Sequence, residues 1–351
     1  MRKATLAVQT IEKRIAHADH IMAGVPSERQ LADELGLSRN TVRVAVQHLV
    51  QKGVLVRQNN GRLNVAPPSN PQRRTLCFIV PAGHSTDVDE WRQSVVGLLE
   101  GTFQDYDVTL RNIPQGHWGD PVIQEALSSF DGAYFLAPAE KIPNWLIAKM
   151  KDSPCRVVVL DQDVSAVGLP SVVLFPPAAE HKLFDHLYNL GHRQIDCLNT
   201  QETGAVVAGR MTVWKEYLAS RGIKGKLHSV EKRKPVESAY EYIRDALRSG
   251  VPLASAIFCT TGPAALGAMR AFYEGGLKVG VDVSVCAVNS EGIGRYLMPS
   301  LTALESPPRS LYLRQASEWI ITGEEWHGPL LIQPDDVPLF QGESTGPALA
   351  E

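Results

Sequence analysis

Apolar positions in the first 66 residues follow a helical period and then change to a strand period. Three helices are predicted, beginning near residue 5, Ser27 and Ser38, because each segment carries apolar side chains three or four residues apart. These stripes consist of Leu6, Ile11, Ile15 and Ile21 in 5–23, then Leu31, Ala32 and Leu35, then Val42, Ala45, Val46 and Leu49. Two short β-prone runs follow, at 54–57 and 63–65.

Residues with special backbone preferences separate these elements. Gly36 lies where a tight turn must join the second and third helices, and Gly53 ends the third. Ser38 is predicted to cap the third helix, with Thr41 in place of the Glu or Gln of a full capping box. Asn-Gly at 60–61 lies between the β-prone runs, which is a strong hairpin signal. The pattern therefore predicts helix, turn, helix and a two-stranded wing.

Beyond a proline-rich connector at 67–71, buried strand-like runs alternate with helical stretches. The strand-like runs lie at 76–80, 132–136, 157–160, 171–174, 195–198, 256–259 and 283–286. Helical stretches between them include 90–103, 177–190, 207–221, 236–249 and 262–275. Continuous apolar strands with helical crossovers indicate parallel sheets covered on both faces. A region of this length implies two such sheets, and hence two lobes with a cleft at the carboxyl ends of the strands.

Charge is distributed unevenly between these parts. Residues 1–74 hold twelve Lys/Arg and five Asp/Glu, a formal net charge of +7, whereas residues 75–351 hold 23 against 33, a net of −10. A small basic module on an acidic body is typical of a protein in which that module alone approaches nucleic-acid phosphates.

Several function classes find no support in the residues. No apolar run is long enough to span a membrane and no signal-type block follows the amino terminus, so we expect a cytoplasmic protein without a membrane partner. The five cysteines show neither a C-x-x-C pair nor zinc spacing, and we expect no metal and no other cofactor. No G-x-G-x-x-G follows Val80, and no P-loop or G-x-S-x-G elbow occurs, which argues against an enzyme.

The first 66 residues resemble the GntR family of bacterial regulators. The resemblance is carried by P-S-E-R at 26–29, L-G-L-S-R-N-T-V-R at 35–43, the G-V-L step at 53–55 and the wing glycine. It implies a winged helix-turn-helix whose second motif helix enters the major groove of double-stranded DNA. The wing departs from the usual G-x-G-T-F-V tip and reads N-G-R-L-N-V at 60–65. On this basis the predicted DNA-contacting residues are Arg29, Ser38, Arg39, Asn40, Thr41, Arg43, Arg57, Asn60, Gly61 and Arg62.

The remainder resembles the effector domains of the LacI/galactose-repressor family. Matching segments are LYNLGHRQI at 187–195, GRMTVWKEYL at 209–218, the A-x-G-A-like helix and following strand at 264–285, and PSLTAL at 299–304. Both resemblances together imply the arrangement of arabinose-repressor-like regulators. The expected fold is an N-terminal winged helix-turn-helix (α+β) followed by a two-lobed α/β periplasmic-binding-protein-like domain with parallel sheets. The expected domains are 1–66, a linker at 67–74, and an effector-binding and dimerisation domain at 75–351.

The second resemblance implies an effector cleft, but several sugar-gripping positions depart from the family pattern. No carboxylate follows Phe175 until Glu180, the usual N-D before the A-x-G-A helix reads T-T at 260–261, and the usual G-[FY]-D-[DN] reads A-V-N-S at 287–290. Arg210 is retained, and without an acidic neighbour it would suit an anionic sugar derivative. The predicted effector-binding residues are His84, Trp91, Phe175, Arg210, Thr261, Asn289 and Ser306. Core, capping or surface roles remain alternatives for these side chains.

The leading hypothesis is a homodimeric transcription regulator, more specifically a repressor, that binds a palindromic DNA operator. A carbohydrate-like or anionic sugar-derived effector between the lobes would control it. The alternative is a DNA-bound dimer whose second domain has lost its ligand and serves as an interaction scaffold.

Overall fold

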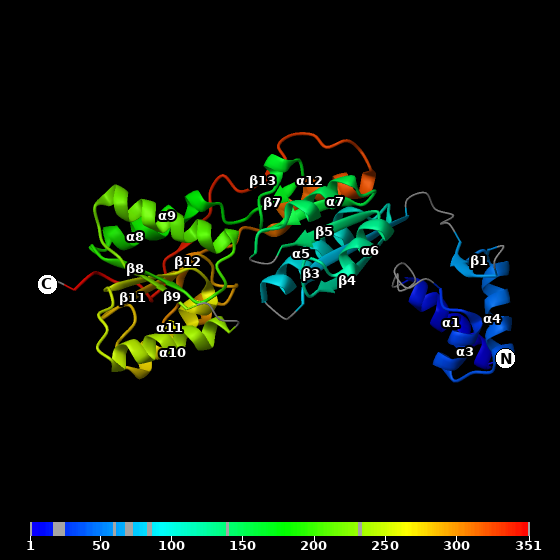
Figure 1. Cartoon of the computed structure of the whole chain (residues 1–351), viewed down its shortest axis with the longest axis horizontal. Coiled ribbons are helices and arrows are strands. Elements are labelled where there is room, and N and C mark those ends of the chain that lie inside the picture. The colour runs from blue at the N-terminus through cyan, green and yellow to red at the C-terminus, as the bar shows by residue number, and fades with distance from the viewer. Residues whose placement is uncertain are drawn as a thin grey trace.

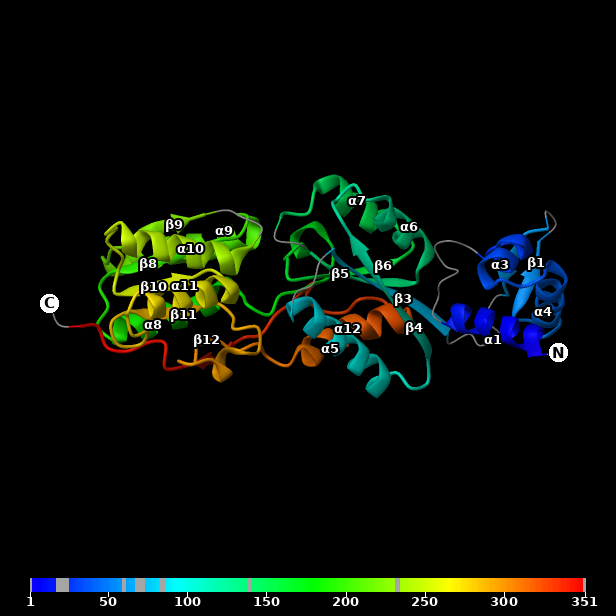
Figure 2. The same cartoon turned by 90° about the horizontal axis from the view of Figure 1, so that it is seen from below.

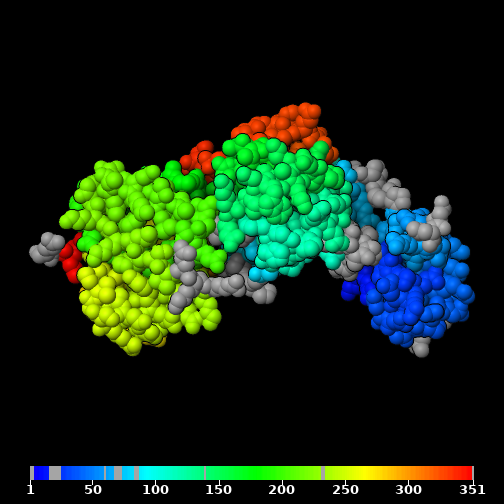
Figure 3. Space-filling model, viewed as in Figure 1, coloured from blue at the N-terminus to red at the C-terminus, as the bar shows by residue number. Residues whose placement is uncertain are grey.

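The computed structural model describes residues 2–16, 25–58, 61–66, 73–82, 86–137, 140–230 and 234–349. They form a small N-terminal unit and two α/β lobes, each with its own six-stranded sheet. The N-terminal unit lies at one end of the molecule, and the lobe that contains β3 lies between it and the second lobe (Figures 1 and 2). The space-filling view shows the same order (Figure 3). The predicted fold class is confirmed.

The N-terminal unit is a winged helix-turn-helix. Its elements are α1 (Arg2–Ala16), α3 (Glu28–Leu35), α4 (Arg39–Gln51), β1 (Leu55–Arg57) and β2 (Leu63–Val65). The two strands pair antiparallel, and the apolar stripes of the helices meet the first residue of each strand in one small core. A core this small depends on well-formed helix ends, because few buried side chains hold it together.

Polar caps define the helices of this unit. Ser27 and Gln30 form a full capping box, in which the Ser27 hydroxyl accepts a hydrogen bond from the backbone N–H of Gln30 at 3.3 Å. Gly36 ends α3 in the left-handed conformation, with φ of 61°. The predicted cap Ser38 is confirmed, since its hydroxyl accepts from the backbone amide of Thr41 at 3.2 Å.

One predicted core position in this unit, Leu6, is wrong. Its side chain is 57% exposed, whereas the neighbouring Ala7 is fully buried together with Ile11 and Ile15. Residues four apart lie on one helix face, and Leu6 is one residue, or about 100°, away from that face. Ile21 and the predicted connector at 67–71 lie outside the described residues.

The first lobe contains an all-parallel sheet in the order β13-β7-β6-β5-β3-β4. Helices α5 (Thr86–Thr102) and α12 (Arg309–Thr322) cover one face, while α6 (Pro121–Ser129) and α7 (Asn144–Asp152) cover the other. The strands are β3 (Arg73–Pro81), β4 (Asp107–Gln115), β5 (Gly132–Leu136), β6 (Arg156–Leu160), β7 (Ser171–Val172) and β13 (Leu331–Ile332).

The second lobe has the strand order β14-β12-β11-β10-β8-β9, parallel except for β14 at one edge. Helices α8 (His181–Asn189) and α9 (Ala205–Arg221) cover one face, while α10 (Pro235–Arg248) and α11 (Gly262–Glu274) cover the other. The strands are β8 (Ile195–Asn199), β9 (Leu227–Ser229), β10 (Ala256–Cys259), β11 (Ser284–Ala287), β12 (Thr302–Leu304) and β14 (Leu339–Phe340). The predicted buried strands and their helical crossovers are thus present in both lobes.

Within the described chain, the backbone passes between the two lobes three times. It leaves the first lobe after β7, returns through residues 305–308 to α12, and leaves again between β13 and β14. The predicted strand at 171–174 is shorter for this reason: residues 173–176 lead toward the second lobe, where the single-turn helix η2 (Pro177–Glu180) precedes α8. Each lobe is therefore built from segments that are distant in sequence.

The close packing of α10 against α11 leads to a prediction. A β-carbon at Gly267 would lie 2.1 Å from the carbonyl oxygen of Val236 and 2.8 Å from the Ala239 side chain. Gly267→Ala should therefore push the two helices apart and lower the free energy of unfolding by about 1–3 kcal/mol. Gly97→Ala is the matched control, because a β-carbon at this exposed helical glycine meets nothing within 4 Å. Chemical denaturation of both variants measures the difference, and equal stability would contradict the packing described here.

Candidate functional site

Helix α4 presents a polar face away from the core of the N-terminal unit. Arg39, Asn40 and Arg43 are exposed, whereas the apolar stripe of α4 is buried. The Arg43 guanidinium donates to the side-chain oxygen of Asn40 at 3.0 Å, so the two side chains are held side by side. The hydroxyls of Ser38 and Thr41 lie 2.8 Å apart and hydrogen bond with each other at the start of the helix. Amide, hydroxyl and guanidinium groups are the groups that read base edges and hold phosphates.

The other predicted contacts surround this helix start. Arg29 on α3 is exposed, as are Gly61 and Arg62 on the wing, and Asn60 lies outside the described residues. Arg57 forms an ion pair with Glu28 at 2.5 Å. This pair joins the wing to the start of α3, so Arg57 positions the wing even without DNA.

Two exposed side chains of α4 were not among the predicted DNA-contacting residues. Val44 is 49% exposed, and Gln47 is exposed one turn further along the same face. An apolar residue is not ordinarily considered a DNA contact, so Val44 was not identified as a candidate. Exposed methyl groups on such a helix suit contact with the methyl group of thymine.

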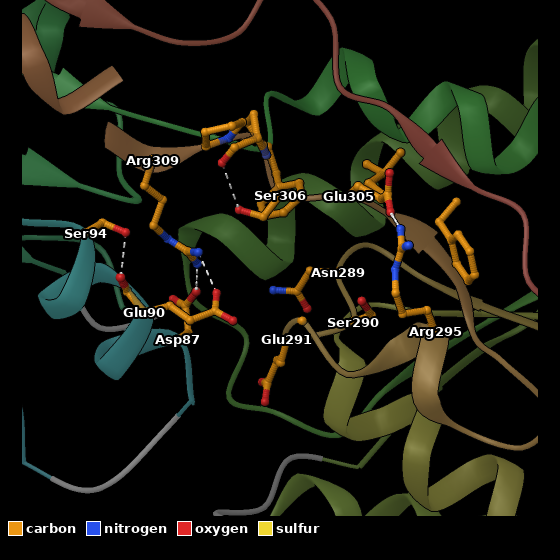
Figure 4. A pocket seen from close by; sticks show the side chains of 16 residues that line it. Asp87, Glu90, Ser94, Asn289, Ser290, Glu291, Arg295, Glu305, Ser306 and Arg309 are labelled. Atoms are coloured by element: carbon orange, nitrogen blue, oxygen red, sulfur yellow. Dashed lines mark hydrogen bonds and ion pairs between the residues drawn. The ribbon is translucent and has the colours of Figure 1, made fainter. Parts of the chain in front are cut away.

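Two adjoining cavities lie between the lobes. The larger has a volume of about 610 Å³ and the smaller about 340 Å³. Both are lined by side chains from each lobe and by the crossing segments, and they share Asp87, Phe175, Asn289, Glu291 and Arg309. Figure 4 shows the smaller cavity, in which the Arg309 side chain points toward Asp87 and Glu90 of α5 and hydrogen bonds with both. Their combined volume is that of a small-molecule site.

The structure brings five of the seven predicted effector residues to these cavities. Arg210 and Thr261 line the larger cavity and Ser306 lines the smaller, while Phe175 and Asn289 line both. Trp91 lines neither cavity, because its side chain is fully buried in the core of the first lobe. His84 lies outside the described residues.

Arg210 has an acidic neighbour, contrary to the expectation from the sequence. Its guanidinium donates to the carbonyl of Thr260 at 2.7 Å, and its Nε lies 4.0 Å from Oε1 of Glu180. Burial lowers the pKa of Arg210, and the Glu180 carboxylate opposes that change. The sequence distance of thirty residues concealed this contact, which the fold creates by packing η2 against α9.

Glu180 is itself an unusual group. Its side chain is 2% exposed, and Oε2 has no hydrogen-bond partner among the described residues. Burial raises the pKa of Glu180 to about 7, and the nearby Arg210 limits the rise. A buried, unpartnered carboxyl oxygen is costly unless a ligand donates to it.

In a second cluster, on the side of the first lobe, only Trp91 was among the predicted effector-binding residues. Arg309 forms ion pairs with Asp87 at 2.6 Å and Glu90 at 2.5 Å, and its guanidinium lies 5.1 Å from the centre of the Trp91 ring. The Trp91 indole donates to Asp161 at 2.9 Å. Asp161 follows β6 directly, with φ of 62°. Its place after a buried strand was the available signal, since the carboxyl ends of parallel strands border the cleft.

Asp161 is partly buried and lines the larger cavity. Burial raises the pKa of Asp161 to about 8, and the neighbouring Asp87 carboxylate adds to the rise, while Trp91 and Arg309 act against it. Two carboxyl groups in contact cannot both ionise without a large electrostatic cost. The acid form of Asp161 is therefore the stable one near neutral pH.

Family models match both parts of the chain. The model described as "Bacterial regulatory proteins, gntR family" matches residues 8–65, and the model described as "Periplasmic binding protein-like domain" matches residues 184–319. The chain therefore joins a GntR-type DNA-binding domain to a periplasmic-binding-protein-like domain, and its curated relatives include LacI-type repressors. The resemblances read from the sequence are thereby confirmed.

Curated relatives match this chain across much of its length. The probable HTH-type transcriptional repressor ExuR of Bacillus subtilis (strain 168) is 22% identical over 231 residues, covering 66% of this chain and 68% of the relative. The lactose operon repressor of Escherichia coli (strain K12) is 23% identical over 314 residues, covering 88% of this chain and 79% of the relative. Both are named as repressors, which agrees with the prediction that this chain is not an enzyme.

Solved structures with the same fold include two LacI-type regulators. A regulator CCPA from Weissella paramesenteroides with bound sucrose gives a TM-score of 0.66 at 19% identity, covering 78% of this chain and 99% of that chain. The Lac repressor bound to ONPG gives a TM-score of 0.65 at 18% identity, covering 88% of this chain and 90% of that chain.

A search of the described residues for membrane-spanning helices found no helix with the necessary length and apolar character.

The raised pKa of Asp161 leads to a prediction about stability. The folded chain keeps this proton up to about pH 8, whereas the unfolded chain releases it near its ordinary pKa of 3.8, so folding becomes less favourable as the pH rises between these values. Asp161→Asn removes that penalty. Thermal unfolding should show the melting temperature of the variant rising relative to that of the wild type between about pH 4 and about pH 8.

Asp105→Asn serves as the control, because Asp105 is exposed and lies outside both cavities. It should follow the wild type at every pH. A constant difference between wild type and Asp161→Asn across the range would show that Asp161 is ionised in the folded protein.

Proposed function

We propose that the protein is a transcription repressor that binds operator DNA through residues 1–66 and is controlled by a small carbohydrate-like effector between its two lobes. Residues 67–74 would act as the linker and residues 75–351 as the effector-binding and dimerisation domain. The observation that carries the proposal is the exposed polar face of α4, with Arg39, Asn40 and Arg43 opposite a fully buried stripe. The matched relatives, which are named as repressors, support the direction of regulation.

The DNA contacts divide into two kinds. Arg43, held beside Asn40, would read base edges in the major groove, since a guanidinium can donate two hydrogen bonds to guanine. Arg29 would hold a phosphate from the start of α3, and Gly61 and Arg62 would approach the backbone from the wing. Arg57, already paired with Glu28, would act by orienting the wing.

A homodimer follows from the size of one such module. A single helix in the major groove covers a half-site, and a two-fold protein on a palindromic operator doubles the number of base contacts. The basic charge of residues 1–74 and the acidic charge of the remainder direct the N-terminal unit toward DNA.

The effector would bind in the two adjoining cavities. Asn289, Thr261 and Glu180 can exchange hydrogen bonds with hydroxyl groups, and Phe175 offers an apolar face. The reason for expecting an anionic effector, an Arg210 without an acidic neighbour, no longer holds, because Glu180 lies beside it. Ligand binding between lobes that differ in closure would shift operator affinity, by about 1–3 kcal/mol in typical allosteric proteins.

This proposal is tested by selecting operator sequences from random duplexes with the wild-type protein and then measuring two arginine variants. Arg43→Ala should cost about 1–3 kcal/mol and relax the sequence preference at one position, because it removes a base contact. Arg29→Ala should weaken binding to all sequences and reduce the salt dependence by about one unit of slope, because it removes a phosphate contact.

Arg270→Ala is the control for this experiment, since Arg270 is an exposed arginine of the second lobe that pairs with Glu274. It should bind the selected operator like the wild type. Failure of the wild-type protein to enrich any sequence, or unchanged binding by Arg43→Ala, would contradict the DNA-binding assignment.

A further inference from the structure

The inter-lobe cavity is lined by more acidic than basic side chains. Among the described residues that line the larger cavity, five are carboxylates and three are cations. The carboxylates are Asp87, Asp161, Asp163, Glu180 and Glu291, and the cations are Lys141, Arg210 and Arg309. The smaller cavity adds Glu90, Glu305 and Arg295. Even with Asp161 in its acid form, the described lining of the two cavities holds six other acidic side chains and four basic ones, so an anionic ligand would meet an excess of like charge.

The two guanidinium groups inside the cavity are already engaged. Arg309 is held by Asp87 and Glu90, both within 2.6 Å. Arg210 donates to the Thr260 carbonyl and faces Glu180. Lys141 is exposed and so remains hydrated. A ligand that used Arg210 or Arg309 as its cation would have to disturb their existing contacts with Glu180, Asp87 and Glu90, which is costly.

The carboxyl oxygens of Asp161 and Glu180, in contrast, receive fewer hydrogen bonds than they can accept. Asp161 accepts a hydrogen bond from Trp91, and the Asp87 carboxylate raises the pKa of Asp161, so Asp161 keeps its proton near neutral pH. Glu180 has a buried oxygen that no described residue donates to. These two carboxyl groups belong to opposite lobes and line the same cavity.

We propose that the effector is an amino sugar, whose ammonium group takes the place of the proton between Asp87 and Asp161 and whose hydroxyl groups donate to Glu180 on the opposite lobe. An ammonium group carries three donors and one positive charge, which is what a pair of carboxylates lacks. The sugar ring would lie against Phe175, which lines both cavities. This inference rests on the proposed effector function and names the class of ligand.

Proton release distinguishes this ligand from a neutral sugar. Below about pH 7 the sugar amine enters as an ammonium group, so Asp161 must give up its proton to the solvent when the ligand binds, and the affinity should rise with pH from about 6 to about 7. The charged groups that face Asp161 and Asp87 around the cavity are Glu90, Asp163, Glu180, Glu291, Lys141, Arg210 and Arg309. A neutral sugar leaves the proton in place and should show no such dependence from Asp161.

The test uses the full-length protein and two matched sets of probes: glucose, glucosamine and glucuronate, and galactose, galactosamine and galacturonate. Thermal unfolding ranks the six probes, because a ligand that binds the folded state raises the midpoint. Calorimetry in two buffers of different ionisation enthalpy then measures proton release. An amine should bind about tenfold or more tightly than its neutral and acidic counterparts, with release of a proton.

Variants complete the test. Asp161→Asn should lose about tenfold or more in affinity for the amine, while unfolding near pH 6 at a temperature no lower than that of the wild type. Asp105→Asn, an equal change of charge at an exposed site outside the cavities, should leave the affinity unchanged.

Tighter binding of a neutral or acidic member would overturn the inference and leave the proposed effector function in place. Binding of the amine without proton release, or unaffected by Asp161→Asn, would also overturn it. If none of the six probes binds, the amino-sugar assignment fails. The DNA-binding part of the proposed function is judged separately, by the operator measurements on Arg43→Ala.

Discussion

The ion pairs of Arg309 with Asp87 and Glu90 fix the point where the chain returns from the second lobe to the first. Arg309 begins α12, and both carboxylates belong to the first turns of α5, so one guanidinium joins the two helices that cover the same face of the sheet. A guanidinium buried on the Trp91 ring is tolerated only with paired charges, because an isolated buried ion is strongly destabilising. Since Asp87 and Arg309 also line both cavities, the shape of the inter-lobe site depends on the same contacts.

Elements that follow from local patterns were predictable from the sequence. The buried strands of both sheets are continuous apolar runs, and the helices of the N-terminal unit carry apolar residues three or four positions apart. Both patterns correspond to elements of the structure. Strand β4 (Asp107–Gln115) was not predicted, because this edge strand is only partly buried and mixes polar with apolar residues. Leu6 was assigned to the core because an apolar residue in a helix ordinarily faces inward, but Ala7 occupies the buried face instead.

The binding site was predictable in outline and not in detail. Motif positions located Arg210, Thr261 and Asn289, which line the larger cavity. Their electrostatic surroundings come from tertiary contacts that no local pattern encodes: Glu180 meets Arg210 from a different element, and Arg309 reaches α5 from more than two hundred residues away. The sequence therefore indicated where a ligand would bind, while the sign of the charge that it meets required the fold.

The way in which the lobes are interleaved gives the cavity its capacity to regulate. Asp161 belongs to the first lobe and Glu180 to the second, so a ligand that contacts both has a different binding energy in open and closed arrangements. A ligand changes the balance between two arrangements only by this difference in affinity. The first lobe begins with β3 at Arg73, shortly after the wing in the sequence. A rotation of this lobe would therefore move the point at which the N-terminal unit is connected to it. Two such units on one operator must keep a fixed spacing. Under the proposed function, a small change in lobe closure would change the distance between the two DNA-contacting helices of a dimer, without any contact between ligand and DNA.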